Sequence, residues 1–485
     1  MSQHGPKFSL FVFDKAQIVR EGEEEKKALC FFPEGMSANQ IKGAVGLAEG
    51  LITFTAVFSP KSPCEVMHAE HHRQVFYQCE QDLWSVLVIP HEVANPSEVR
   101  DGALQLLLKE AYDVYHLLHG SMRYALQQEA SGVRLRQMVV PYYSDLWSRL
   151  LTGRKGDLGV LANGLCGREG TPLLPLARST TLLAQSIVNL LQSSYGGKAV
   201  RHSMMLYDHQ LVSSGLFPED TVVLYRFALR CLVPSVTSAT AASIIRSRIA
   251  RVTNSAPSAG TPFRQGDWKL GGDMYVVPAD GAYNSYAMPL VYLQDGTSYR
   301  LLTYQQEAIT ILMLLDNETV QMHQAALLRK QLATLIASRV HTLEATLSEH
   351  FSSANRWHVP GYRYLFIDWP FRTVRFSPEN KASTLSKESF ALLNAVRTDV
   401  EERANHELHV GRADKYVRGG AASDKHESEW EICVRANHDA WVVVRRCRGR
   451  ELYVVLEKAG ETLMEVQDLM QRFSENSFSG IFDAE

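Results

Sequence analysis

The order of predicted strands and helices repeats three times along the chain, and this repetition constrains the fold more than any other feature of the sequence. Each stretch reads as two strands, a helix, three strands and a closing helix. Short runs rich in aromatic and β-branched residues predict the strands, and longer runs with apolar residues three and four positions apart predict the helices. The stretches share this order and not their amino-acid sequences, so they predict related α/β folds in series.

The predicted domains cover residues 1–132, 201–355 and 356–485, and residues 133–200 form a helical connector between the first two. We expect each domain to be an α+β layered fold, in which a five-stranded, antiparallel-type sheet carries one early and one late helix. A chain of 485 residues is too long for one hydrophobic core, which agrees with several domains. Residues 234–266 are rich in Ser, Thr and Ala, which predicts a mobile insert in the second domain.

The early helix of the first domain, predicted at residues 41–60, has two unlike faces. One stripe at helical spacing should pack on the sheet and consists of Ile41, Val45, Ala48, Ile52 and Thr55. The opposite side holds three glycines, Gly43, Gly46 and Gly50. Each glycine costs a helix about 1 kcal/mol relative to alanine, and a solvated face would not normally need them.

These glycines remove side chains at the places where another backbone could approach closely. Leu47 and Phe54 lie beside them and would supply apolar contact area. We therefore predict a protein-docking helix, whose contact residues are Lys42, Gly43, Gly46, Leu47, Gly50 and Phe54. The alternative is a weak helix that only its own sheet stabilises.

Composition narrows the class of partner. The 50 basic and 53 acidic side chains leave the chain nearly neutral, so nothing in the charge balance calls for nucleic acid. The 7 cysteines include no CxxC pair, and we expect reduced thiols in a cytoplasmic protein. No segment is expected to reach the roughly 18 apolar residues of a membrane span. Any work on membranes would then be done from their surface.

Residues able to carry catalysis do not occur in the patterns that catalysis needs. The cluster His68, Glu70, His71 and His72 lacks the HExxH spacing of a zinc site, so a solvated or interface-lining strand is the better interpretation. The serines of the hairpin predicted at residues 203–216 lack a GxSxG elbow. We expect no catalytic residue, no metal and no cofactor.

Four arginines gather in a predicted hairpin of the third domain: Arg445, Arg446, Arg448 and Arg450. Charged side chains on edge strands discourage aggregation, which explains the cluster without a ligand. The functional alternative is a membrane-binding patch, where each basic residue near an anionic surface contributes about 1 kcal/mol. The basic residues at 246–251 are a second candidate for this role.

Several strings, spread in order over nearly the whole chain, resemble one known family. They are GLITFTAVFSP, HHRQVFYQCEQDLWSVLVI, LYDHQLVSSGL and RGRELYVVLEKAGETLMEV. On these strings the chain is identified as a member of the Ccz-one family of vacuolar fusion proteins and is similar to its plant-type members. The family belongs to the tri-longin group, so the resemblance implies a longin fold for each of the three predicted domains.

The resemblance also implies a function. It implies that the chain pairs with a Mon-one-like longin subunit and that this heterodimer promotes nucleotide exchange on the late-endosomal Rab-seven-like GTPase. The first longin domains would pair and the GTPase would dock on their composite surface, which places residues 41–58 at or near the contact. No exchange activity is expected of the chain alone.

The other implied properties concern membranes. The second and third domains would complete the dimer and face an anionic or phosphoinositide membrane. The chain would be cytoplasmic and peripheral on the late endosome, prevacuolar compartment or vacuole, where vesicle-mediated transport and autophagy converge. Two alternatives remain: a scaffold or tether of a longin complex without exchange activity, and a subunit of another longin-type Rab exchange factor, such as the Hermansky-Pudlak or planar-polarity pairs.

Overall fold

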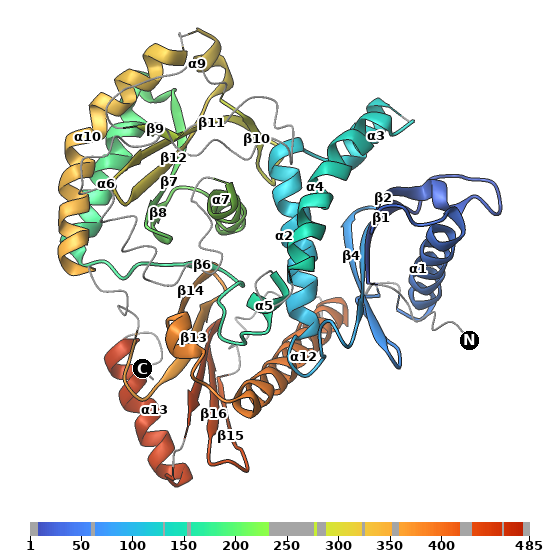
Figure 1. Cartoon of the computed structure of the whole chain (residues 1–485). Helices are drawn as coiled ribbons and strands as arrows, with labels where there is room; N and C mark the ends of the chain where they lie inside the picture. The colour runs from blue at the N-terminus through green and yellow to red at the C-terminus, as the bar shows by residue number, and fades with distance from the viewer. Residues whose placement is uncertain are drawn as a thin grey trace. The chain divides into compact units, whose positions relative to one another are not determined.

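The computed structural model describes residues 8–59, 64–129, 131–152, 157–231, 276–278, 288–322, 325–351, 358–417, 429–457 and 460–478 (Figure 1). The insert predicted at 234–266 lies outside these described residues. Contacts between residues divide the chain into two compact units. Unit 1 comprises residues 1–95, 103–160 and 173–354, and unit 2 comprises residues 96–102, 161–172 and 355–485.

In the described residues, three mainly antiparallel sheets share one strand order, in which the first strand lies between the second and the fifth. The first sheet has the order β2-β1-β5-β4-β3. Its strands are β1 (Ser9–Asp14), β2 (Ala28–Phe32), β3 (Val66–His68), β4 (His72–Glu80) and β5 (Leu83–Pro90). The predicted fold class, α/β layers on antiparallel sheets, is confirmed.

The second and third sheets repeat this order as β8-β7-β12-β11-β10 and β14-β13-β17-β16-β15. The strands of the second are β7 (Val200–Tyr207), β8 (Gln210–Ser214), β10 (Leu290–Tyr292), β11 (Ser298–Gln306) and β12 (Ile309–Leu315). Those of the third are β13 (Arg363–Asp368), β14 (Thr373–Phe376), β15 (Trp430–Arg435), β16 (Trp441–Cys447) and β17 (Arg450–Leu456). Each of these two sheets carries one more strand than predicted, because β9 (Val276–Pro278) pairs in parallel with β11 and β6 (Thr171–Pro172) pairs in parallel with β14.

Each sheet has an early helix after its second strand and a late helix after its fifth. The early helices are α1 (Ala38–Phe58), α7 (Pro218–Cys231) and, after the short α11 (Glu379–Ala382), α12 (Lys387–Val417). The late helices are α2 (Asp101–His119), the pair α9 (Asn317–Met322) and α10 (Ala325–His350), and α13 (Leu463–Ser477). The element order predicted from the sequence therefore holds in all three repeats.

Two helix predictions were wrong at their ends. The pattern of residues 96–126 predicts one helix, but α2 stops at His119 because Gly120 is left-handed, with φ of 74°. A separate helix α3 (Met122–Gln128) follows, and its first amides donate to the Glu80 carboxylate. In the third domain the pattern predicts a helix from Leu385 to about Glu402, but α12 continues to Val417, since the residues that follow include the good helix formers Arg, Ala, Glu, Leu and Lys and one glycine does not end the helix.

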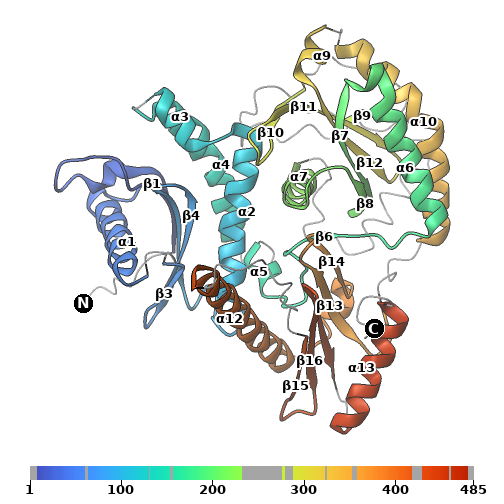
Figure 2. The same ribbon diagram turned by 180° about the vertical axis from the view of Figure 1, so that it is seen from behind.

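The first domain has three layers, which explains why β1 and β5 are buried along almost their full length. Helix α1 covers one face of the sheet, and α2 lies on the other face together with α4 (Val133–Leu151), as both views show (Figures 1 and 2). Trp147 of α4 stacks on Phe32 of β2, with ring centroids 6.4 Å apart. The Tyr142 hydroxyl of α4 donates to the Ala111 carbonyl of α2 over 2.5 Å.

The region predicted as a connector, residues 133–200, does not form a layer of its own. Its first helix, α4, packs on the first sheet as described. A short α5 (Asp157–Leu161) follows, and β6 joins the third sheet. Its last helix, α6 (Arg178–Ser193), packs beside α10, where the Arg339 guanidinium donates to the Ser186 carbonyl over 3.2 Å. The exact domain boundaries stay a prediction.

Candidate docking surface on the first domain

Hydrogen bonds at both ends of helix α1 define where it starts and where it ends. The backbone amide of Ser37 donates a hydrogen bond to Gln40 Oε1, in the first turn of the helix, over 3.1 Å. At the other end the Ser59 amide donates to the Thr55 carbonyl over 2.8 Å. The observed bounds, Ala38–Phe58, start three residues earlier than the sequence pattern predicts.

One face of α1 belongs to the core of the first domain. Val45, Ala48 and Ile52 are buried, and Ile41 is half-buried beside them. They pack on the sheet residues Phe11, Phe13, Phe76, Trp84, Val86 and Val88. The predicted packing stripe is therefore confirmed for these four residues, and Thr55, at its end, is half-buried.

The opposite face of α1 is open. A methyl group built on Gly43, Gly46 or Gly50 would meet no atom within 4 Å beyond the helix itself. No other part of the described structure therefore packs against these three positions, and none of its contacts requires a glycine there.

Large apolar side chains continue this open face toward the end of the helix. Leu47 is 50% exposed and Phe54 is 63% exposed. Val57 and Phe58 are exposed as well, at 74% and 72%. The rings of Phe54 and Phe58 lie edge to face with centroids 5.0 Å apart, so they form one aromatic pair in solvent.

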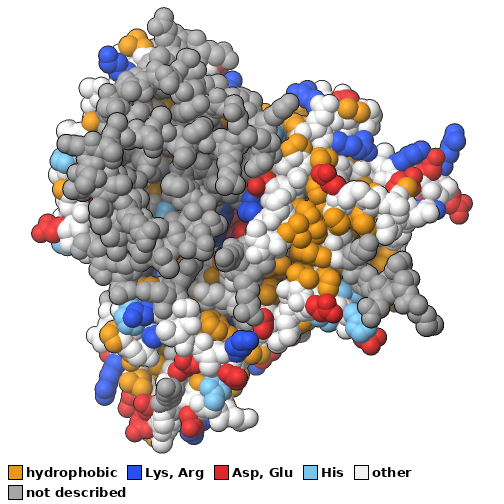
Figure 3. All heavy atoms as spheres, viewed as in Figure 1, with side chains coloured by type: hydrophobic (Ala, Val, Ile, Leu, Met, Phe, Trp, Pro, Cys, Tyr) orange, Lys and Arg blue, Asp and Glu red, His pale blue; other side chains and the backbone are white. Residues whose placement is uncertain are grey.

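Sequence reasoning named Leu47 and Phe54 but missed Val57 and Phe58. The signal was present, because Val57 and Phe58 follow Phe54 by three and four positions and so share its side of the helix. Hydrophobic side chains also gather in the space-filling view over the first sheet, between α4 and α1 (Figure 3). Together the glycines and these four side chains define the docking face: Gly43, Gly46, Leu47, Gly50, Phe54, Val57 and Phe58.

Charged residues border the docking face and are paired within the domain. The Lys42 ammonium lies 3.7 Å from a Glu24 carboxylate oxygen, and the Lys27 ammonium lies 2.8 Å from Glu49. Lys42 is therefore a residue of the rim and not of the apolar centre. An apolar centre with a polar rim is the usual composition of a protein interface.

From the sequence we expect no segment long and apolar enough to span a membrane, but one helix meets that criterion. Among the described residues, α1 is long and apolar enough to span by length and composition, with a mean hydropathy of 1.4 over 18 residues, of which 17% are buried. The reason is that glycine, alanine and threonine fill the gaps between large apolar residues and only Lys42 and Glu49 are charged. Since one face of α1 packs on the sheet, its apolar character is that of a domain helix with an uncovered second face.

The four predicted membrane-binding arginines do not share one environment. Arg450 lies 3.0 Å from an Asp368 carboxylate oxygen, and Arg446 lies 3.9 Å from Glu451. Arg448, at the turn, is 60% exposed and lies 3.9 Å from Glu429. Arg445 is half-buried on β16, opposite Glu431 of β15. Nearby carboxylates thus offset much of the positive charge of this hairpin, and its membrane role stays a prediction.

The histidine cluster lies at the edge of the first sheet, where β3 turns into β4. His71 is 3.6 Å from the exposed Glu70 carboxylate. Burial lowers the pKa of His72, and the neighbouring His91 and His71 lower it further. In the part of the chain that the structure describes, no three His, Cys, Asp or Glu side chains are grouped closely enough to hold a metal ion.

Comparisons with known proteins agree with this architecture. The family described as the first longin domain of INTU, CCZ1 and HPS4 matches residues 8–120, which run from β1 to the end of α2. Vacuolar fusion protein CCZ1 homolog B of Arabidopsis thaliana is 32% identical over 510 residues, which cover 99% of this chain and 98% of the relative.

Two further relatives match over similar lengths. Vacuolar fusion protein CCZ1 homolog of Oryza sativa subsp. japonica is 33% identical over 494 residues, with 98% of this chain and 97% of the relative covered. The homolog of Xenopus laevis is 25% identical over 501 residues, with 98% and 96% covered. The first domain is thus a longin domain, and the chain belongs to the family of vacuolar fusion protein CCZ1 homologues.

Proposed function

We propose that this chain is one subunit of a heterodimeric guanine-nucleotide exchange factor that activates a Rab-seven-like GTPase in vacuolar trafficking. Family membership supports the vacuolar role, because the relatives are named vacuolar fusion proteins. The docking face of α1 supports the heterodimer. It is the one observation that carries the proposal: an apolar helix flank, bare of side chains at three glycines, in the longin domain itself.

Uncovered apolar area of this kind favours a protein partner. Leu47, Phe54, Val57 and Phe58 gather along about three turns of one helix, and such clusters on soluble proteins mark interaction sites. Aromatic anchors at the centre of an interface often carry most of its binding energy. The three glycines would let a partner's backbone or helix approach α1 more closely than a helix surface covered by side chains allows. A Mon-one-like longin subunit is the partner that we assign to this face, with the GTPase on the surface that both subunits build.

Exchange by such a complex needs no acid, base, nucleophile or metal. A factor that binds the nucleotide-free GTPase more tightly than the nucleotide-bound form lowers nucleotide affinity by the same factor, because binding linkage is reciprocal. Contacts to magnesium and phosphate order the switch region of a GTPase, and holding that region away removes them. The function therefore rests on surfaces, and the chain contributes by shaping one of them.

The proposed place of work is the cytoplasmic surface of the late endosome, prevacuolar compartment or vacuole. The complex would lie on the membrane peripherally and would recognise anionic lipids or phosphoinositides. Exchange activity belongs to the assembled complex. The chain alone would bind the GTPase weakly and would not accelerate release of the nucleotide from it.

The test is a nucleotide-release assay with a fluorescent guanine nucleotide on the Rab-seven-like GTPase. The chain with its co-expressed Mon-one-like partner should accelerate release, and the chain alone should not. Leu47→Asp should abolish acceleration, whereas Leu182→Asp should leave it unchanged, because Leu182 lies on α6 and is at least as exposed, at 62% against 50% for Leu47. Normal release by the Leu47→Asp complex would contradict the role of α1. Partner binding without any release would instead support a scaffold.

A further inference from the structure

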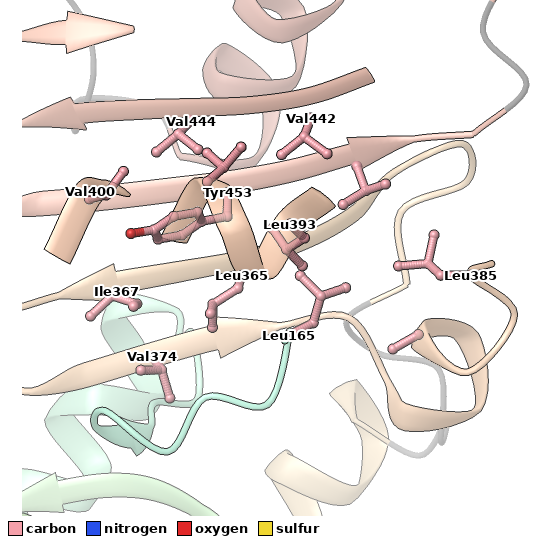
Figure 4. Close-up of a cluster of buried hydrophobic side chains, with 13 residues drawn as sticks. Leu165, Leu365, Ile367, Val374, Leu385, Leu393, Val400, Val442, Val444 and Tyr453 are labelled. Carbon is pink, nitrogen blue, oxygen red and sulfur yellow. The ribbon is translucent and has the colours of Figure 1, made fainter. Parts of the chain in front are cut away.

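Residues 161–172, here called the strap, lie within unit 2 although they are separated in sequence from the third domain by the whole of the second. Leu165 of the strap has no exposed surface and belongs to the hydrophobic cluster on one face of the third sheet. Figure 4 shows it pointing among side chains of the third domain, close to Leu365 and Leu393. The strap is thus part of this core.

Three glycines of the strap permit an unusually close approach. A Cβ atom on Gly170 would lie 2.5 Å from the Arg372 carbonyl oxygen, a backbone atom that cannot move aside easily. On Gly167 it would lie 2.7 Å from the Phe376 ring, and on Gly164 it would lie 2.7 Å from the Asn394 side chain. Each glycine faces a different part of the third domain, so the strap packs closely against this domain from Gly164 to Gly170.

Backbone hydrogen bonds fix the register of the strap. The Thr171 amide donates to the Arg372 carbonyl over 2.8 Å, and β6 then pairs in parallel with β14 at the edge of the sheet. The Arg397 guanidinium of α12 donates to the Gly164 carbonyl at the other end. This is recognition by strand addition, in which the backbone bonds provide the affinity and pockets provide the specificity.

A buried charge cluster adds specificity. The Glu169 carboxylate of the strap accepts hydrogen bonds from Arg397 and, over 3.3 Å, from Arg100. Arg100 also pairs with Glu401 of α12. Burial opposes ionisation of Glu169, but the positive charges of Arg397 and Arg100 outweigh it and keep its pKa below the usual value. Without Glu169, Arg100 would keep its pair with Glu401, whereas the buried Arg397 would lose the carboxylate that it pairs with here.

We propose that the strap is an internal ligand of the third domain, and that the domain completes its fold only when Glu169 is held between Arg100 and Arg397. The binding site for the strap is built from the edge of β14, from α12 and from residues 96–102. Residues 356–485 alone therefore lack a part of their own core. Release of the strap would uncover the β14 edge and expose two guanidinium groups that suit a carboxylate.

The test uses the full chain and compares hydrogen exchange in each variant by mass spectrometry. Gly170→Ala should raise exchange at least tenfold in β14 and in the first turns of α12, with the first sheet unchanged. Gly460→Ala is the matched control, since a Cβ atom there meets nothing within 4 Å, and it should leave exchange unchanged. Wild-type exchange in Gly170→Ala would overturn the proposal.

A milder variant, Glu169→Gln, keeps the test decisive if Gly170→Ala does not fold. It should speed trypsin cleavage within the strap at least tenfold and raise exchange in β14 and α12 together. Faster cleavage with wild-type exchange in β14 and α12 would mean that the strap only lies on the surface, and would refute the proposal. Adding Arg397→Gln to Glu169→Gln removes one unpaired cation and should restore part of the protection.

Discussion

Substitutions on the two faces of α1 should separate folding from docking. Ile52 is 4% exposed and lies in the core cluster of the first domain. Ile52→Ala removes buried methyl groups and should lower the free energy of unfolding by about 2 to 5 kcal/mol. Phe54 is 63% exposed, and Phe54→Ala loses mainly its edge-to-face contact with Phe58, which contributes about 0.5 to 1.5 kcal/mol.

The order of the two effects should reverse for binding of the partner subunit. Phe54 is an aromatic residue at the centre of the docking face, so Phe54→Ala should weaken the complex by at least about 2 kcal/mol, or about 30-fold in Kd. Ile52→Ala faces the sheet and should change Kd only slightly in protein that remains folded.

Urea unfolding of each variant measures the first effect, and titration with the purified partner subunit measures the second. The reasoning fails if Phe54→Ala lowers the unfolding free energy as much as Ile52→Ala, because Phe54 would then be covered by its own domain. It also fails if Phe54→Ala binds the partner with wild-type affinity.

Three further predictions concern pH, a helix cap and the membrane. Burial lowers the pKa of His119 to about 4 in the folded chain. Below about pH 6.5 the unfolded chain therefore binds a proton on this histidine that the folded chain does not bind. The free energy of unfolding should fall as the pH decreases from about 6.5 toward 4. In urea unfolding, His119→Phe should reduce the loss between pH 7 and pH 5 by up to about 2 kcal/mol; an unchanged loss would contradict this. The Thr462 side chain accepts a hydrogen bond from the Glu465 amide at the start of α13. Thr462→Ala should lower the free energy of unfolding by about 1 kcal/mol in the same assay. Arg448→Glu should reduce flotation with acidic liposomes, and wild-type flotation would count against this hairpin.

Periodicity in the sequence was enough to predict the strands and the two faces of α1. Apolar residues at helical spacing placed Val45 and Ile52 on the core side, and the glycines marked the open side. These features are local, because the residues that form each pattern lie within a few positions of one another in the sequence. The same local patterns gave the order of strands and helices in all three repeats.

The features that the sequence did not predict depend on contacts between distant residues. Arg397 and Glu169 are 228 residues apart, and Arg450 and Asp368 are 82 apart, so no periodic pattern connects them. Gly164, Gly167 and Gly170 lie in the region predicted as a helical connector, and only the folded third domain shows what these glycines approach. For the same reason the sequence alone suggests a positive patch at the arginine hairpin, because the carboxylates beside it become apparent only in the fold.

The central claim is that another protein chain covers the docking face of α1. Its most direct test is the rate of maleimide labelling of Phe54→Cys, measured in the chain alone and in the co-purified complex with the Mon-one-like subunit. Labelling should slow at least tenfold in the complex, while Leu182→Cys on α6 should react at one rate in both. Equal labelling of Phe54→Cys in the chain and in the complex would show that the docking face stays open, and would contradict the account.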